Sequence, residues 1–417
     1  MTIDHDPALR LEASWLADAA LQRVFDALLL DGDEARMVGG VVRNTLLQVP
    51  VTDIDIATTA LPQTVMARAR AAGLKAVPTG IDHGTVTIVA DHHPFEVTTL
   101  REDVETFGRK ATVRFGRDWL ADARRRDFTM NALYADRDGR LFDPVGGYRD
   151  CLTRHVRFIG DARQRIREDY LRILRFFRFH ATYGAGTIDA DGLAAVAAER
   201  SGLATLSAER VGHELRRLVV APGAAETVRV MAEHGIAEPA FGRPVTPDRL
   251  IRLRALADIV GEPVDPALAF VALAVESPGD AERLARHLRL ANKDRDRMAA
   301  IAAAATPLAA PPTRERAQEL LYRKGRDTYR GTVLIAWARS IAHGDDPAWQ
   351  RFFALSDSWQ PPAFPLAGRD LIAAGIAPGP EVSARMERTE AWWIAGSFEA
   401  GREALIAHAL RQEDAKD

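Results

Sequence analysis

The hydrophobic pattern of the chain changes near residue 157, and this change restricts the fold more than any other feature. Before it, short β-like runs bounded by turn residues alternate with helical stretches, one of which begins at Pro62 and ends before Gly73. After it, apolar residues recur at three- and four-residue spacing between Pro and Gly breaks. The sequence therefore predicts an α+β fold, in which an N-terminal head with a mixed sheet and helices precedes an all-α remainder. The runs expected as strands are Ala35–Val38, Val51–Thr58, Gly84–Ala90, Phe95–Thr99 and Asn131–Asp136.

The composition is that of a globular protein from a reducing compartment. With 417 residues, of which 47% are hydrophobic, the chain is long enough for two to four domains with buried cores. Its single cysteine, Cys151, excludes an internal disulfide and a multi-cysteine metal site. No run approaches the roughly 18 apolar residues that cross a bilayer, and Met1–Pro7 carries acids instead of a signal segment. We therefore expect a cytoplasmic protein with no membrane partner.

Charge is distributed unevenly along the chain. The net charge of −3 argues against a protein that coats nucleic acid without selectivity. The segment Arg101–His180 nevertheless holds 19 Lys and Arg against 13 Asp and Glu. The basic part of any binding cleft is therefore expected in this segment.

A pair of aspartates, Asp53 and Asp55, indicates a metal site. In an expected strand their spacing of two places both on one face, with Ile54 and Ile56 on the other. Two carboxylates at this spacing repel each other, and a divalent cation is the usual reason for keeping both ionised. Oxygen ligands suit Mg²⁺, and two such ions could activate an attacking hydroxyl and stabilise a pyrophosphate leaving group. Taken alone, the pair is more often a solvated strand face.

The residues around this pair favour phosphate chemistry. Upstream, Gly39 and Gly40 separate a strand from a helical start, so that backbone N–H groups can approach a phosphate while Arg43 adds charge. Glu96 shares a strand face with Thr98 and is a candidate third catalytic carboxylate, with a structural role as the alternative. A metal-dependent nucleotidyl transfer is the reaction that this set predicts.

Five sequence blocks, in order and spacing, resemble the bacterial and eukaryotic-type (class II) CCA-adding tRNA nucleotidyltransferases and their poly(A) polymerase relatives. The resemblance continues weakly through Ser207–Arg210 and Gly368–Leu371, so it covers most of the chain but has diagnostic motifs only in the first half. The blocks are Gly39-Gly40-x-x-Arg43, Asp53-x-Asp55, Glu96-Val97-Thr98-Thr99, Arg125-Arg126-Asp127-Phe128-Thr129-Met130-Asn131-Ala132 and Glu168-Asp169-x-x-Arg172.

The resemblance implies a fold, a reaction and a set of partners. It implies a nucleotidyltransferase head over residues 1–155, a base-recognising helical neck over 156–225, a helical body over 226–345 and a helical tail over 346–417 that contacts tRNA. The implied reaction is template-independent addition of C, C and A to the tRNA 3′ end from CTP and ATP, with Mg²⁺ as cofactor and release of pyrophosphate. The implied partner is tRNA, bound through its 3′ end and acceptor/TΨC region.

Base choice is expected to come from a helix over residues 164–180. Adenine and cytosine each present an amine donor next to a ring-nitrogen acceptor, so that Asp169 can accept from the amine while Arg172 donates to the nitrogen. Guanine and uracil would leave a buried polar group unpaired. At about 100° per residue, Arg178 points roughly opposite Asp169. Arg175 and Arg178 are therefore left to the triphosphate, to neighbouring helices or to movement between the C and A states.

The family pattern also implies roles for three more residues. Arg126 and Asp127 are implied to face the nucleotide, where Arg126 can hold a phosphate oxygen and Asp127 can accept from ribose hydroxyls; a buried ion pair is the structural alternative. The segment Arg101–Arg117, with Gly108, matches the position of a flexible loop in the family. Asn44 stands where the family usually has an acid, and we expect it to accept a hydrogen bond from Arg43.

Three alternatives remain at this stage. A poly(A) polymerase, or a partial enzyme that adds only CC or only A, would share the same motifs. A non-catalytic RNA-binding protein that kept the fold is the alternative from another class, and the intact Asp53, Asp55, Asp169 and Arg172 argue against it.

Overall fold

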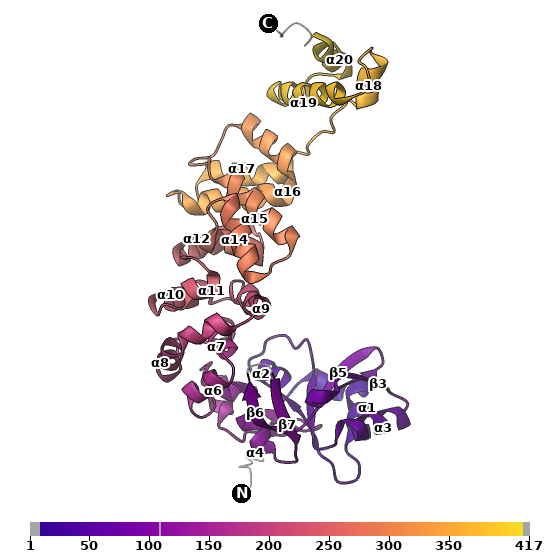
Figure 1. Ribbon diagram of the computed structural model, residues 1–417, viewed down its shortest axis with the longest axis vertical. Coiled ribbons are helices and arrows are strands. Elements are labelled where there is room, and N and C mark those ends of the chain that lie inside the picture. The colour runs from indigo at the N-terminus through magenta and orange to yellow at the C-terminus, as the bar shows by residue number, and fades with distance from the viewer. Residues whose placement is uncertain (1–8, 108–109, 412–417) are drawn as a thin grey trace. The chain divides into compact units, whose positions relative to one another are not determined.

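The computed structural model describes residues 9–107 and 110–411, without the side chains of residues 103–113 (Figure 1). The chain forms two compact units, residues 1–244 and 245–417. Gly108 of the expected flexible loop lies outside the described residues. Part of that loop forms a two-stranded antiparallel sheet, β6 (Arg101–Phe107) and β7 (Lys110–Phe115).

The head is built on a seven-stranded mixed sheet with the order β3-β4-β5-β2-β1-β8-β9. The pair β2–β5 is parallel, whereas the other neighbouring pairs are antiparallel. The expected strand Ala35–Val38 is confirmed at its predicted bounds, whereas β3, β6, β7 and β9 were not predicted. The strands are β1 (Ala35–Val38), β2 (Asp55–Thr58), β3 (Lys75–Gly80), β4 (Thr85–Ala90), β5 (His93–Thr99), β8 (Tyr134–Ala135) and β9 (Leu141–Phe142).

Helices α1 (Ala19–Leu28) and α3 (Pro62–Ala71) pack against each other and against β4 (Figure 1). The predicted bounds of α3 are confirmed, since Pro62 is its first residue and Gly73 follows its end with φ +72°. The other head helices are α2 (Gly40–Leu46), α4 (Trp119–Arg124) and α5 (Gly147–Leu152).

Helices alone form the rest of the first unit. An aromatic cluster joins them to the head, since the Phe128 ring lies 5.0 Å from that of Phe158 and 4.9 Å from that of Phe179. These helices are α6 (Ala162–Glu168), α7 (Leu171–Tyr183), α8 (Ala190–Ala198), α9 (Ala208–Leu218), α10 (Ala224–Glu233) and α11 (Ala237–Phe241).

The continuous helix expected over residues 164–180 is wrong. The backbone is extended at Asp169, with φ −156° and ψ 104°, so that α6 and α7 are separate helices. The Asp169 carboxylate accepts a hydrogen bond from the backbone N–H of Leu171 at 3.1 Å. Aspartate favours such local bonds over helix interiors, which explains the break.

The second unit is wholly helical in its described residues. Every residue of α13 after Pro266 is buried, and α16 is interrupted at Gly325, where φ is +72°. No helix in the described part of the chain is long and apolar enough to cross a membrane. The helices are α12 (Pro247–Val260), α13 (Pro266–Ala274), α14 (Pro278–Leu288), α15 (Asn292–Ala305), α16 (Arg314–Arg339), α17 (Pro347–Ser358), α18 (Gly368–Ala373), α19 (Pro380–Ala395) and α20 (Arg402–Leu410). The predicted fold class, a mixed-sheet head followed by helices, is confirmed.

Candidate active site

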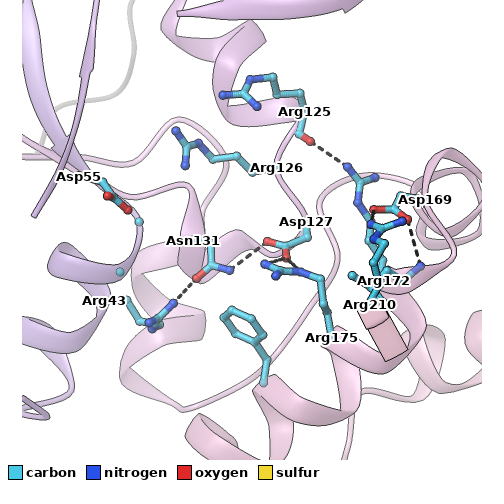
Figure 2. Close-up of a pocket in the computed structure, with 14 residues that line it drawn as sticks. Arg43, Asp55, Arg125, Arg126, Asp127, Asn131, Asp169, Arg172, Arg175 and Arg210 are labelled. Carbon is cyan, nitrogen blue, oxygen red and sulfur yellow. Dashed lines mark hydrogen bonds and ion pairs between the residues drawn. The ribbon is translucent and has the colours of Figure 1, made fainter. Parts of the chain in front are cut away.

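A polar cavity of about 430 Å³ lies in the first unit, where the head meets α7 and α9 (Figure 2). Arginines and aspartates make up most of its wall. Eight of the residues predicted from sequence line it, whereas Asp53, Glu96 and Arg178 do not. The lining residues are Gly39, Gly40, Arg43, Asp55, Arg125, Arg126, Asp127, Asn131, Asp169, Leu171, Arg172, Arg175, Phe179 and Arg210.

The turn between β1 and α2 forms one part of the wall. Gly39 has φ +70° and ψ −113°, a conformation that other residues rarely adopt. A Cβ on Gly39 would lie 3.5 Å from the carbonyl oxygen of Asn131 and 3.7 Å from Nη1 of Arg126. Glycine therefore allows the backbone to come close to two polar groups of the cavity.

Arg43 extends from α2 and is buried. Its Nε and Nη2 donate to Oδ1 of Asn44 at 3.1 and 2.8 Å, which confirms the hydrogen bond expected between these residues. Nη2 also donates to the Tyr183 hydroxyl at 2.8 Å, and Nη1 donates to Oδ1 of Asn131. Arg43 therefore ties the glycine turn to α7.

The two aspartates of the expected metal site do not both lie on a strand. Asp55 is the first residue of β2 and lines the cavity, whereas Asp53 is exposed in the loop before it. The strand expected over Val51–Thr58 is therefore too long at its start, and the predicted alternation does not apply to Asp53. Met37 and Ile56 are the last residues that pair between β1 and β2. In the described residues, β1 therefore provides no partner for the residues that precede Ile56.

Glu96 lies directly beside Asp55 in the parallel pair β2–β5. The alternation expected for β5 is confirmed, because Phe95 and Val97 are buried whereas Glu96 is exposed. No three Asp, Glu, His or Cys side chains among the described residues are grouped so that they could hold a metal ion. The structure thus brings Glu96 next to Asp55 on the neighbouring strand, and its role as a third catalytic carboxylate stays a prediction.

The charge around Asp55 fits a divalent cation. The pKa of Asp55 is raised to about 6, chiefly by burial and also by the negative charges of Glu96 and Asp53, whereas the positive charge of Arg126 lowers it. A cation held by Asp53 and Asp55 would relieve this repulsion, and carboxylate oxygens are ligands that hard cations prefer.

Asp122 of α4 positions two arginines of the cavity and was not predicted. It is buried, and its two carboxylate oxygens accept from Arg125 at 2.8 Å and from Arg126 at 3.0 Å. The Tyr134 hydroxyl donates to the same carboxylate at 2.8 Å. These donors hold the pKa of Asp122 far below its usual range, although burial alone would raise it. The spacing of three and four residues from Asp122 to the two arginines was the available sequence signal.

Asp127 is surrounded by protein donors (Figure 2). Oδ1 accepts from the backbone N–H of Phe128 at 2.8 Å and from Asn131 at 2.9 Å, and Oδ2 accepts twice from Arg175, at 2.8 and 2.6 Å. Burial would raise the pKa of Asp127, but the Arg175 charge and these bonds lower it to about 2. The expected bond to a ribose hydroxyl would require one of these bonds to open.

Asp169 has fewer donors. Arg210 of α9 donates to its Oδ2 at 2.6 Å, and the only other bond to its carboxylate among the described residues is that from Leu171. Arg210 lines the cavity and belongs to a block that resembles the family only weakly, so it was not assigned a role from sequence.

Arg172 is held at the edge of the cavity by three acceptors. Its Nη1 donates to Glu168 at 2.6 Å and to the carbonyl oxygen of Arg165 at 2.8 Å, and its Nη2 donates to the carbonyl oxygen of Arg125 at 3.1 Å. The structure therefore brings Arg172 and Asp169 into one cavity, as predicted, although across a helix break.

Arg178 is not among the residues that line the cavity, and its assignment as a nucleotide-binding residue stays a prediction. Its buried guanidinium pairs with the buried carboxylate of Glu214 on α9. This position agrees with the expectation that Arg178 points away from Asp169. Phe179, which follows it, lines the cavity and was not predicted.

Two family models match the chain. The model described as "Poly A polymerase head domain" matches residues 35–157, and the model described as "Probable RNA and SrmB- binding site of polymerase A" matches residues 187–248.

Named relatives match either nearly the whole chain or about half of it. The mouse protein "CCA tRNA nucleotidyltransferase 1, mitochondrial" is 31% identical over 93% of this chain and 89% of its own length. The "CCA-adding enzyme" of Geobacillus thermodenitrificans is 42% identical over 49% of this chain and 50% of its own length. Among solved structures, the Bacillus stearothermophilus CCA-adding enzyme in complex with CTP has a TM-score of 0.77 at 29% identity, and the match covers 94% of this chain and 96% of that one.

Proposed function

Because the chain belongs to the family of CCA-adding tRNA nucleotidyltransferases, we propose that its cavity carries out the family reaction with the residues described above. The chain adds C, C and A to the 3′ end of tRNA from CTP and ATP, without a template and with release of pyrophosphate. The observation that carries the residue assignment is the cavity itself, which places Asp55, Arg43 and the Asp169–Arg172 pair around one space.

Asp53 and Asp55 are the proposed ligands of Mg²⁺. When bound, the metal supplies charge that activates the tRNA 3′ hydroxyl and stabilises the pyrophosphate leaving group. Asp55 contributes a carboxylate at the cavity wall, and Asp53 lies in a loop that can bring a second one beside it. Glu96 acts as a neighbouring negative charge in this proposal, since it lies beside Asp55 on β5.

The triphosphate is assigned to the glycine turn and to two arginines. The Gly39–Gly40 backbone allows phosphate oxygens to come close, Arg43 provides positive charge, and Arg126 provides directed hydrogen-bond donors. Asp122 holds the Arg126 guanidinium in place through a hydrogen bond. This guanidinium is therefore already ordered before the nucleotide binds.

Base choice is assigned to Asp169 and Arg172. The Asp169 carboxylate accepts from the exocyclic amine of cytosine or adenine, and Arg172 donates to the ring nitrogen beside it. Guanine and uracil present the reverse arrangement, which would leave the two side chains unpaired. Asp127 and Arg175 are assigned to the sugar and phosphate side of the cavity, with Asp127 acting chiefly by orienting Arg175.

The remaining assignments concern the rest of the chain and its location. The proposed domains are a head over residues 1–155, a neck over 156–225, a body over 226–345 and a tail over 346–417, with the tail contacting tRNA. The proposed location is the cytoplasm, in keeping with the single, buried and unpaired Cys151.

The direct test is nucleotide incorporation into tRNA that lacks its terminal triplet. With Mg²⁺, the protein should add two C from CTP and one A from ATP and should not use GTP or UTP. Extended A-tailing would identify a poly(A) polymerase, and a product that stops after CC or begins only at A would identify a partial enzyme.

The metal assignment has its own test. Asp53→Ala should abolish incorporation, whereas the affinity for tRNA, measured by gel shift, should stay within about twofold of wild type because Asp53 is exposed. Retained activity in this variant would show that Asp53 is not a metal ligand.

A further inference from the structure

Six arginines line the cavity, and they differ in how their charge is balanced. Five of them form an ion pair with a carboxylate: Arg125, Arg126, Arg172, Arg175 and Arg210. A carboxylate partner cancels most of the field of a guanidinium at the distance of a ligand. These five side chains therefore offer directed hydrogen bonds but little net positive charge to an anion.

Arg43 is the exception. Among the described residues, no carboxylate lies within ion-pair distance of its guanidinium, although only 6% of Arg43 is exposed. All its side-chain hydrogen bonds go to neutral groups, the amide oxygens of Asn44 and Asn131 and the hydroxyl of Tyr183. Burial lowers the pKa of Arg43, but a guanidinium in a protein keeps its proton at neutral pH. A buried positive charge without an ion-pair partner among the described residues therefore lies at the cavity wall, and the charge of Asp127 acts on it only from beyond ion-pair distance.

Asn44 explains how this charge is kept without a counter-ion. Its Oδ1 accepts twice from Arg43, and its Nδ2 donates to the carbonyl oxygen of Pro50 at 2.9 Å. An aspartate at this position would neutralise Arg43 and would place a carboxylate oxygen against the Pro50 carbonyl. The amide thus orients Arg43 and holds the loop that leads to Asp53, without cancelling charge.

Two aromatic rings of α7 hold the same guanidinium. It lies 4.0 Å from the centroid of the Tyr183 ring and 5.3 Å from that of Phe179. Ring faces attract cations without forming a full ion pair, and this attraction is strongest where water is excluded. Tyr183 and Phe179 therefore stabilise the charge of Arg43 and fix its direction.

We propose that Arg43 is the one uncompensated cation of the triphosphate subsite, and that Asn44, Tyr183 and Phe179 are positioning residues that keep its charge available for the triphosphate and for pyrophosphate. This inference rests on the proposed function. Asn44 stands where the family usually has an acid. According to this inference, the effect of that difference is a larger positive charge at the triphosphate subsite and not a less rigid loop.

The first experiment compares Asn44→Asp with Asn44→Ala in the full-length protein. Asn44→Asp introduces the missing counter-ion, so KM for CTP and ATP and the inhibition constant of inorganic tripolyphosphate should each rise about fivefold, with base choice unchanged. Asn44→Ala removes the same Pro50 contact without adding charge, so it should lower kcat and change the tripolyphosphate constant by less than about twofold. The salt dependence of this constant should also become shallower only in Asn44→Asp.

The second experiment removes the ring and the hydroxyl of Tyr183 separately. Tyr183→Phe keeps the ring face and should raise the tripolyphosphate inhibition constant about twofold, whereas Tyr183→Leu removes both contacts and should raise it about tenfold. Phe179→Leu should act in the same direction as Tyr183→Leu, because it removes the second ring. These variants test the inference even where an Asn44 variant does not fold.

Two results would overturn the inference while leaving the proposed function intact. One is an Asn44→Asp enzyme that still adds CCA and has the wild-type constants for tripolyphosphate, CTP and ATP. The other is an equal change in Asn44→Asp and Asn44→Ala, which would assign the effect to the Pro50 contact. If the wild-type protein adds no nucleotide to tRNA, the proposed function fails first.

Discussion

At the scale of single residues, the acids of the cavity differ in how many of their lone pairs are already in use. An ionised carboxylate offers about four acceptor sites. The four bonds described above fill those of Asp127, whereas within the described part of the chain Asp169 accepts two, from Leu171 and Arg210. The Asp169 side chain is also more exposed, at 20% against 9%. Asp169 is therefore equipped to accept from a base, and Asp127 to hold protein donors in place.

This difference leads to a prediction for Asp169. Asp169→Ala removes the acceptor for the exocyclic amine, so discrimination of CTP against UTP should fall by a factor of about 10 to 100 in kcat/KM. The measurement is single-nucleotide incorporation with each of the four nucleotides. Asp169→Asn is the matched control, since it keeps one oxygen and the shape of the side chain. Unchanged selectivity in Asp169→Ala would refute base reading by this residue.

Asp127 leads to a prediction about pH. Because its pKa is about 2 in the folded protein, against 3.8 ordinarily, its ion pair stabilises the fold above pH 4 and this contribution is lost as the pH falls from about 4 to 2. Asp127→Asn should therefore be less stable at pH 7 by roughly 2 kcal/mol, and the difference should shrink below pH 4. Urea unfolding of both proteins between pH 7 and 3 measures this. A constant difference over that range would show that the carboxylate charge contributes nothing.

At the scale of elements, two short breaks in regular structure form the cavity. One is the turn from β1 to α2 at Gly39, and the other is the extended residue Asp169 between α6 and α7. Each break exposes polar groups that a continuous element would hide, the backbone of the turn in one case and the Asp169 carboxylate in the other.

The first break can be tested by substitution. Gly39→Ala should strain the turn by roughly 1–3 kcal/mol and bring a methyl group towards Arg126, so KM for both nucleotides should rise and incorporation should fall. Gly73→Ala is the control, because Gly73 has nearly the same φ, +72°, with no atom near the added Cβ. It should lower the melting temperature without changing KM, and equal kinetic effects in the two variants would contradict a specific role for Gly39.

At the scale of the whole molecule, the cavity belongs entirely to one compact unit. All its lining residues fall within residues 1–244, and the second unit, residues 245–417, has its own buried helix α13 and aromatic clusters such as that of Trp393. The residues that line the cavity and the tail that we propose to contact tRNA therefore fall in different units.

A truncated chain tests this separation. A fragment of residues 1–244 should bind CTP and ATP within about threefold of the full chain, because every cavity contact is retained, while its affinity for tRNA should fall by at least about tenfold. Calorimetric titration with each nucleotide and gel shifts with tRNA measure the two effects. A folded fragment that binds tRNA as tightly as the full chain would contradict a tRNA-binding role for residues 245–417.

The sequence by itself determined the class of fold and most of the cavity. Local pattern is enough to locate the strand Ala35–Val38, the helix that begins at Pro62 and the change to helices near residue 157, since these depend on side-chain periodicity and on Pro and Gly. The motif spacing also identified eight of the lining residues.

Only the tertiary structure decided which charges meet. The pairing of Arg178 with Glu214 and the pairing of Asp169 with Arg210 join elements that are distant in the sequence, so no local pattern fixes them. The start of β2 at Asp55 and the break at Asp169 likewise depend on where a neighbouring strand ends and which hydrogen bonds compete with the helix. The lack of an ion-pair partner for Arg43 is a property of this arrangement, because it depends on which side chains of the described residues surround its guanidinium.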